Sequence, residues 1–165
     1  MKKFRIFYLI FLIIISVYQF VPIRKTDAYA SKITLYFVDR QMLRLIPWES
    51  YITSSNPDMQ ARLVLEKLIT GKDYNDSIRR ILPDNPKSLT VRVKDKDAVV
   101  NINTEYFSHI ERSRIHEQLI VYQLVNSLCT VEGVLRVKFT IDGEESRNFF
   151  GFMDMREAFV PDYMI

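Results

Sequence analysis

The fold is decided by residues 112–144, RSRIHEQLIVYQLVNSLCTVEGVLRVKFTIDGE, which contain one helix, one turn and one strand. At about 100° per residue, apolar side chains cover most of the helix circumference. They are Ile115, Leu119, Ile120, Val121, Tyr122, Leu124, Val125, Leu128 and Cys129. The polar remainder is a narrow ridge that we expect to face water. It consists of His116, Gln123, Ser127 and Thr130.

The second half of this stretch alternates apolar and polar residues after Gly133, which we expect to end the helix. The apolar positions are Leu135, Val137, Phe139 and Ile141. A period of two is typical of a strand with one core face and one solvated face. The pair Asp142-Gly143 then closes the strand as a turn.

Other segments supply further strands and a second helix. Alternation predicts strands over residues 32–38 and 42–48, and a hairpin over 89–102. The triplet Asn56-Pro57-Asp58 predicts a helix start, because Asn caps free amides, Pro fits the first turn and Asp complements the helix dipole. Gly71 ends this second helix, and a long polar connection follows it.

Two features bear on how these elements pack. Pro47 confines its strand to a sheet edge or a strand end, because proline has no N–H to donate. The residues after Gly143 are rich in Phe and Met, so we expect them to fold back onto the domain. Helices mixed with antiparallel strands predict an α+β fold, a two-layer sandwich of a small mostly antiparallel sheet and two main helices.

The N-terminal part of the chain, residues 1–30, is typical of a targeting segment. A basic segment, residues 2–5, precedes an uncharged apolar run that extends from Ile6 to Val21. The motif Ala28-Tyr29-Ala30 has the form that signal peptidase accepts, with cleavage before Ser31. Because the run is long for a signal peptide, an uncleaved membrane anchor is the alternative. In both cases residues 31–165, predicted as one globular domain, lie outside a bacterial cytoplasmic membrane, either secreted or membrane-anchored.

Charge and cysteine content exclude two classes of protein. The chain has 165 residues and a formal charge of +3, but five of its 23 basic and one of its 20 acidic residues precede Ser31. The remainder has a net charge of about −1, which removes the support for nucleic-acid binding. Cys129 is the single cysteine, so no internal disulfide forms.

Serine and histidine residues near the central helix have the residue types of a nucleophile and a base. They are Ser108-His109 and Ser113 with His116, and Glu111 or Glu117 would orient the imidazole. Ser113 fits better as a helix cap and His116 as part of the polar ridge. No G-x-S-x-G turn is present, so the sequence predicts no catalytic residues.

Acidic residues at the strand ends do not form a recognisable site. Asp142, Glu144 and Glu145 are too few for a calcium loop, and two histidines without ligand-spaced partners do not predict a transition-metal site. Asp39 and Asp142 would act on a glycan only if about 5 to 9 Å apart, and turn chemistry explains both. The sequence therefore predicts no metal and no cofactor.

Three side chains remain to be explained. Trp48 and Tyr51 are candidates for a surface that binds a sugar or a partner, although core packing also explains Trp48. Asn126 lies within the apolar part of its helix, so we expect it to bond a backbone group. Cys129 lies on the same helix, where a thiol would be inert.

Several segments resemble, in order along the chain, the GerMN domain of sporulation and spore germination proteins. They are ITLYFVD (33–39), ARLVLEKLITG (61–71), LP (82–83), VVNIN (99–103), LIVYQLVNSL (119–128), GVLRVKFTIDGE (133–144) and GFMDMREAF (151–159). The resemblance covers essentially the whole chain after the leader.

This resemblance implies a compact α+β domain related to the ring-building domains of sporulation complexes, without enzyme activity. The expected function is that of an extracytoplasmic scaffold or interaction domain in the cell envelope during sporulation or spore germination. Its partners would be envelope or membrane proteins, including copies of itself, with the membrane reached through the N-terminal segment if that segment is uncleaved. The alternative is a module that binds cell-wall glycan or peptide through Trp48 and Tyr51.

Overall fold

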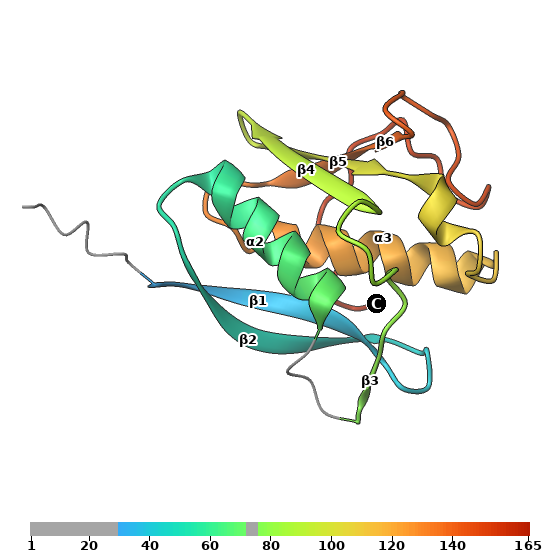
Figure 1. Cartoon of the computed structure of the whole chain (residues 1–165), viewed down its shortest axis with the longest axis horizontal. Helices are drawn as coiled ribbons and strands as arrows, with labels where there is room; N and C mark the ends of the chain where they lie inside the picture. Colours follow the sequence, from blue (N-terminus) through green and yellow to red (C-terminus); the bar gives the residue numbers. More distant parts are fainter. Residues whose placement is uncertain (1–29, 72–75) are drawn as a thin grey trace, which may run out of the picture.

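The computed structural model describes residues 30–71 and 76–165, and it contains strands on both sides of two helices (Figure 1). The α+β class predicted from the sequence is confirmed. The elements in chain order are β1 (Ala30–Asp39), β2 (Leu45–Thr53), α2 (Pro57–Thr70), β3 (Ile78–Arg79), β4 (Leu89–Lys94), β5 (Asp97–Ile102), the 3-10 helix η1 (Thr104–Phe107), α3 (Arg114–Leu128) and β6 (Arg136–Ile141).

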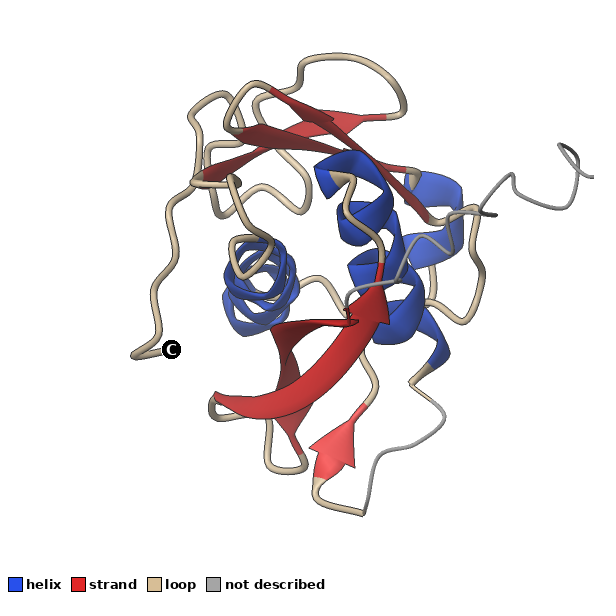
Figure 2. Ribbon diagram, turned by 90° about the vertical axis from the view of Figure 1, so that its left-hand side faces the viewer, coloured by secondary structure: helices blue, strands red, loops and turns tan. Residues whose placement is uncertain are grey.

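The strands form two sheets of three, with the orders β2-β1-β3 and β4-β5-β6. All neighbours are antiparallel except β5 and β6, which are parallel because the connection between them carries α3. Figure 2 shows the two helices between the two sheets. The expected small, mostly antiparallel sheet is therefore present twice. A helix that is apolar around most of its circumference needs neighbours on more than one side.

The central helix α3 is buried, as predicted, but its polar ridge does not face water. Ser113 caps the helix by accepting the N–H of His116 at 3.2 Å. Gln123 and Ser127 are buried, and Ser127 Oγ accepts the N–H of Tyr36 in β1 at 2.8 Å. The prediction of a solvated ridge was wrong because this side of α3 lies against β1, where Ser127 and Thr130 accept backbone N–H groups along the strand's free edge.

Two details of α3 also differ from expectation. Ile115, placed in the apolar face, is 58% exposed. The helix ends at Leu128 rather than near Gly133, because Thr130 N–H bonds to Ser127 O at 3.2 Å and tightens the chain into turns. Thr130 Oγ1 accepts the N–H of Thr34 at 3.3 Å, so the end of α3 is anchored to β1.

The predicted start and end of α2 and the predicted hairpin are confirmed. Asn56 Oδ1 accepts the N–H of Asp58 at 2.9 Å, and Gly71 ends the helix in a left-handed conformation with φ 43°. Residues 95–96 form the turn between β4 and β5, with Asp95 at φ 56°. In the long connection after α2, the short strand β3 pairs with the end of β1.

The second strand begins later and runs further than the sequence predicted. Met42 adopts φ 61° in the turn after β1, so β2 starts at Leu45 and extends to Thr53. Pro47 lies in β2, which is an edge strand as predicted. The N–H of Asp39 bonds to the carbonyl of Arg44, so Arg44 faces β1. Because backbone groups alternate between the two edges of a strand, those of Leu45 and Pro47 point away from β1.

The C-terminal tail folds back over the domain, as the sequence predicted. Phe159 exchanges two backbone hydrogen bonds of 2.8 Å with Val137 in β6. Asn126 pairs with the backbone of Asp162 through bonds of 2.6 and 2.9 Å, which confirms its predicted role. The tail ends beside the other sheet, where Leu45 donates to the carbonyl of Ile165 at 3.0 Å.

The predicted leader lies outside the described residues, apart from Ala30 at the start of β1. Within residues 30–71 and 76–165, none of the helices is long and apolar enough to cross a membrane.

Candidate functional site

The serine and histidine of the predicted helix cap are in contact, but their geometry is that of a cap. Ser113 Oγ lies 2.7 Å from His116 Nδ1 and also accepts the backbone N–H of the same residue. In the described part of the chain, no carboxylate bonds to this ring. Ser108 and His109 are exposed at the end of η1, and Glu111 is exposed before α3. No triad is assembled from these residues.

Glu117 has a different role from the orienting role considered for it. Its side chain is fully buried and accepts three backbone N–H groups, from Phe150 at 2.9 Å and from Phe152 and Met153 at 2.7 and 3.1 Å. These bonds attach a loop of the C-terminal tail to the first turn of α3. The correction follows from tertiary packing, because the loop is distant from Glu117 along the chain and no local pattern predicts their contact.

Asp39 and Asp142 each close a turn, as the sequence suggested. Asp39 Oδ1 accepts the N–H groups of Leu43 and Arg44 at 2.7 and 3.3 Å. Asp142 accepts the N–H of Thr104 at 2.9 Å and its hydroxyl at 2.6 Å, and these bonds lower the pKa of Asp142. Asp39 ends β1 and Asp142 follows β6, which belong to different sheets, and each carboxylate is engaged in its own turn.

The described acidic residues and Cys129 do not form a metal site or a reactive thiol. Among the described residues, no three His, Cys, Asp or Glu side chains converge on a point where a metal ion could bind, including Asp142, Glu144 and Glu145. Burial raises the pKa of Cys129 to about 11, so its thiol is neutral at physiological pH.

Trp48 and Tyr51 lie three positions apart on β2 and therefore point to opposite faces of the sheet. Trp48 is paired with Leu35 on the face toward the helices and is half-buried against the core. Tyr51 is 60% exposed on the outer face, opposite Lys32. The two rings do not form one continuous surface, and Tyr51 is the more exposed of the two.

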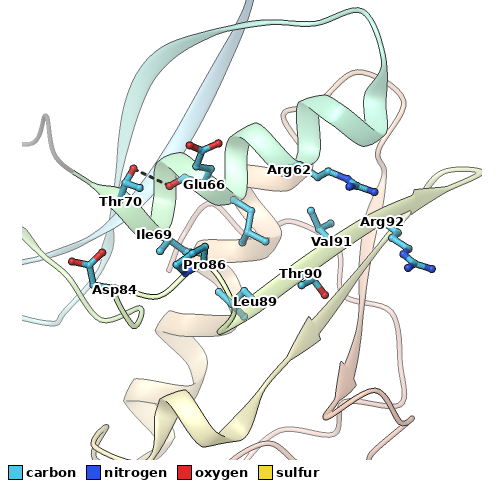
Figure 3. Close-up of a pocket in the computed structure, with 11 residues that line it drawn as sticks. Arg62, Glu66, Ile69, Thr70, Asp84, Pro86, Leu89, Thr90, Val91 and Arg92 are labelled. Atoms are coloured by element: carbon cyan, nitrogen blue, oxygen red, sulfur yellow. Dashed lines mark hydrogen bonds between the residues drawn. The ribbon is translucent and has the colours of Figure 1, made fainter.

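A groove of about 520 Å³ lies between α2 and the edge strand β4, and the sequence did not reveal it. Figure 3 shows that α2 supplies one wall and β4 the other. The apolar lining consists of Leu65, Ile69, Pro86, Leu89 and Val91. No aromatic side chain is among the groove's lining residues.

The charged side chains of the groove separate by sign along its length. Arg62 of α2 and Arg92 of β4 lie toward one end, and Glu66 and Asp84 lie further along (Figure 3). Arg62 forms an ion pair of 2.9 Å with Asp58, and Asp84 one of 3.2 Å with Arg80. Within the described ranges, Arg92 and Glu66 form no ion pair, so both charges are free to meet a ligand.

The sequence contained only a partial signal for this groove. The stripe Ala61, Val64, Leu65, Leu68 and Ile69 marked one face of α2 as apolar, and the alternation in 89–93 marked β4 as a strand. Nothing in either pattern shows that α2 lies along the edge of β4. That placement is a long-range property of the fold.

Comparison with protein families identifies one family. A family model named Germane, described as sporulation and spore germination, matches residues 34–147. No curated protein sequence matches the chain. Solved structures that are similar in fold include the tandem GerMN domains of the sporulation protein GerM from Bacillus subtilis, with a TM-score of 0.62, 20% identity and coverage of 80% of this chain and 46% of that one.

Two further structures have the same fold. The first GerMN domain of the same Bacillus subtilis protein matches with a TM-score of 0.56, 18% identity and coverage of 82% of this chain and 99% of that domain. A candidate lipoprotein from Clostridium perfringens matches with a TM-score of 0.55, 19% identity and coverage of 79% of this chain and 87% of that one. At these identities the similarity establishes a common fold.

Proposed function

Because the chain belongs to the Germane family of sporulation and spore germination proteins and has a GerMN-type fold, we propose that it is a non-enzymatic interaction domain of the cell envelope. In this proposal residues 31–165 form one domain outside the cytoplasmic membrane, delivered by residues 1–30 as a signal peptide or an anchor. Its partners are other envelope or membrane proteins, including copies of itself.

The observation that supports an interaction domain is the use of its polar side chains. Glu117, Asp39, Asp142 and Ser113 each accept backbone N–H groups that would otherwise be unpaired. Catalysis needs acids, bases or nucleophiles that converge in a pocket and are free to react. The groove between α2 and β4 contains arginine and carboxylate side chains over an apolar floor, which suits recognition of a ligand better than a reaction.

The envelope location has two supports. The leader has the charge and hydropathy pattern of an export segment. One protein with the same fold is a candidate lipoprotein, and lipoproteins are attached to membranes. A module that binds cell-wall glycan has less support, because Trp48 and Tyr51 point to opposite faces and the groove has no aromatic lining.

Deletion of the gene in its native sporulating host tests the function. We expect fewer heat-resistant spores or slower germination, measured by plating after heating and by the loss of optical density. Wild-type protein and a His116→Ala variant should both correct the defect when immunoblots show that they are equally abundant. Normal sporulation and germination in the deletion strain would refute the proposal. A stable, abundant His116→Ala protein without function would instead indicate an enzyme.

Location is tested separately in the same cells. Protease added to intact protoplasts should digest residues 31–165, and N-terminal sequencing should find a fraction that begins at Ser31 if the leader is cleaved. A cytosolic reporter protein serves as the control for lysis. Full protection of the domain together with an intact N-terminus in the cytosolic fraction would contradict an envelope location.

A further inference from the structure

Strand β4 has an open edge beside the groove. Val93 N–H donates to Asp58 Oδ1 of α2 at 2.8 Å, so at this position the backbone points away from β5. Because successive residues of an antiparallel strand alternate between the two edges, Val91 and Leu89 also point their N–H and C=O groups away from β5. Those groups face the side on which the groove lies.

The other long edges are covered or interrupted. The outer edge of β6 pairs with Phe159 through two bonds of 2.8 Å, and the edge of β1 is occupied by Ser127 and Thr130 of α3. Edge strand β2 is blocked at Leu45 by the C-terminal carbonyl and lacks a donor at Pro47. Among the described residues, the outward backbone groups of 89–91 in β4 therefore have no partner, and they adjoin the groove.

The groove has the shape and lining for an extended chain. A strand added to β4 would lie about 4.8 Å from it and exchange backbone bonds with Val91. Alternate side chains of that strand would point inward, toward Leu65 and Ile69 of α2, and the rest toward solvent. A volume of about 520 Å³ accommodates a few such side chains.

The charges of the groove specify which extended chain fits. Arg62 and Arg92 at one end attract an acidic residue, whereas Glu66 and Asp84 further along attract a basic one. Since Arg92 and Glu66 form no ion pair within the described parts of the chain, a ligand meets them without displacing a partner. The favoured ligand has a central apolar residue with an acidic residue on one side of it and a basic residue on the other.

We propose that the groove between α2 and β4 binds an extended segment of a partner protein by strand addition to β4, with the acidic residue at Arg92 and the basic residue at Glu66. The proposal deepens the proposed function, on which it rests, by specifying the class of partner. A second copy of the chain is the competing occupant.

A library of random linear peptides displayed on phage tests this directly. The bait is the full chain, leader included, in mild detergent. We expect selected peptides to carry an acidic and a basic residue on either side of an apolar one, and to shift the backbone amide resonances of 89–93 in two-dimensional NMR spectra. Failure to select such peptides, or selection of peptides that bind elsewhere, would refute the proposal.

The variant Val91→Pro removes the outward N–H without removing a donor from the pairing of β4 with β5. We expect binding of the selected peptide to weaken at least about tenfold, because proline cannot donate to an added strand. The matched control is Tyr51→Pro, which also alters an outward position of an edge strand, on the other sheet. It should bind normally, and equal binding by both variants would count against strand addition.

If Val91→Pro does not fold, a charge reversal at Arg92 tests the same binding site. Arg92→Glu should weaken the acidic peptide about fivefold, and a lysine at that peptide position should restore the loss. An unchanged affinity, or the absence of rescue, would contradict the assigned orientation. If the wild-type chain self-associates and Arg92→Glu abolishes this, the occupant is a second copy and the proposal is wrong. These binding results do not depend on the phenotype of the deletion strain. Failure of strand addition can therefore be told apart from failure of the proposed function.

Discussion

Glu117 is the clearest case of a single residue organising a distant segment. One carboxylate has two oxygens and about four lone-pair directions, which is enough for three backbone donors. Its bonds to Phe150, Phe152 and Met153 attach a loop without regular secondary structure to the first turn of α3. The backbone groups of this loop are thereby satisfied without a strand partner.

Replacement of Glu117 should therefore be costly. We expect Glu117→Ala to lower the free energy of unfolding by about 3 kcal/mol or more, because three N–H groups lose their acceptor in a buried site. Glu117→Gln should lose less, since one acceptor oxygen remains. Urea denaturation measures both, and the neighbouring Gln118→Ala should cost under about 0.5 kcal/mol. If Glu117→Ala were as mild as Gln118→Ala, the bonds to the loop would contribute little.

Cys129 is predicted to be unreactive in the folded chain. Burial raises the pKa of its thiol from 9.0 to about 11, so at pH 8 the thiolate fraction is about a hundredfold lower than without burial. Alkylation by iodoacetamide should be slow in buffer, fast in urea, and faster as the pH approaches 11. The control is a Ser108→Cys variant with Cys129→Ala, which exposes one thiol. Equal native rates for both proteins would show that Cys129 is accessible as thiolate.

At the scale of elements, α3 does more than supply apolar surface. Its side chains Ser127 and Thr130 pair with the backbone of Tyr36 and Thr34 along β1. A helix here takes the place that a neighbouring strand would otherwise fill, since β3 pairs only with the last two residues of β1. This is why polar residues are found on a buried face of α3.

Removal of that pairing should destabilise the sheet. We expect Ser127→Ala to cost about 1 to 3 kcal/mol, because the N–H of Tyr36 is left without its acceptor. The exposed residue Ser108 provides the control, and Ser108→Ala should change the free energy of unfolding by under about 0.5 kcal/mol. Hydrogen exchange should show faster exchange at Tyr36 in Ser127→Ala. Unchanged protection there would mean that another group accepts the bond.

At the scale of the whole molecule, the C-terminal tail connects the two sheets across α3. Phe159 pairs with β6, Asp162 with Asn126 of α3, and Ile165 with Leu45 of β2. Tyr163 adds a stacked contact with Tyr36, the ring centroids 5.5 Å apart. The separate sheets thereby share one covalent segment in addition to the helices packed between them.

Deletion of residues 160–165 should weaken the entire domain rather than fray one end. The lost bonds contribute about 1 kcal/mol each and the aromatic pair up to about 1.5, so we expect a loss of roughly 3 to 4 kcal/mol. Thermal unfolding followed by circular dichroism measures it. Met164→Ala is the control, because that side chain is 94% exposed. A truncated chain as stable as Met164→Ala would show that the tail merely rests on the surface.

The sequence by itself determined the α+β class, the N-caps of both helices, the hairpin and the inward fold of the tail. These depend on local periodicity, on capping residues such as Asn56 and Ser113, and on turn residues, all of which are read over a few neighbouring positions. It also identified the backbone role of Asn126, because a polar residue in an apolar face must find a partner.

Only the tertiary structure decided how the elements meet. The ridge of α3, the partners of Glu117, the division into two sheets and the groove between α2 and β4 each join residues far apart in the chain. Periodicity shows that a face is polar or apolar, but not whether water, a strand edge or another segment lies against it. A polar face packs against a strand edge where that edge has unpaired backbone groups, and the position of the edge is known only once the strands are placed.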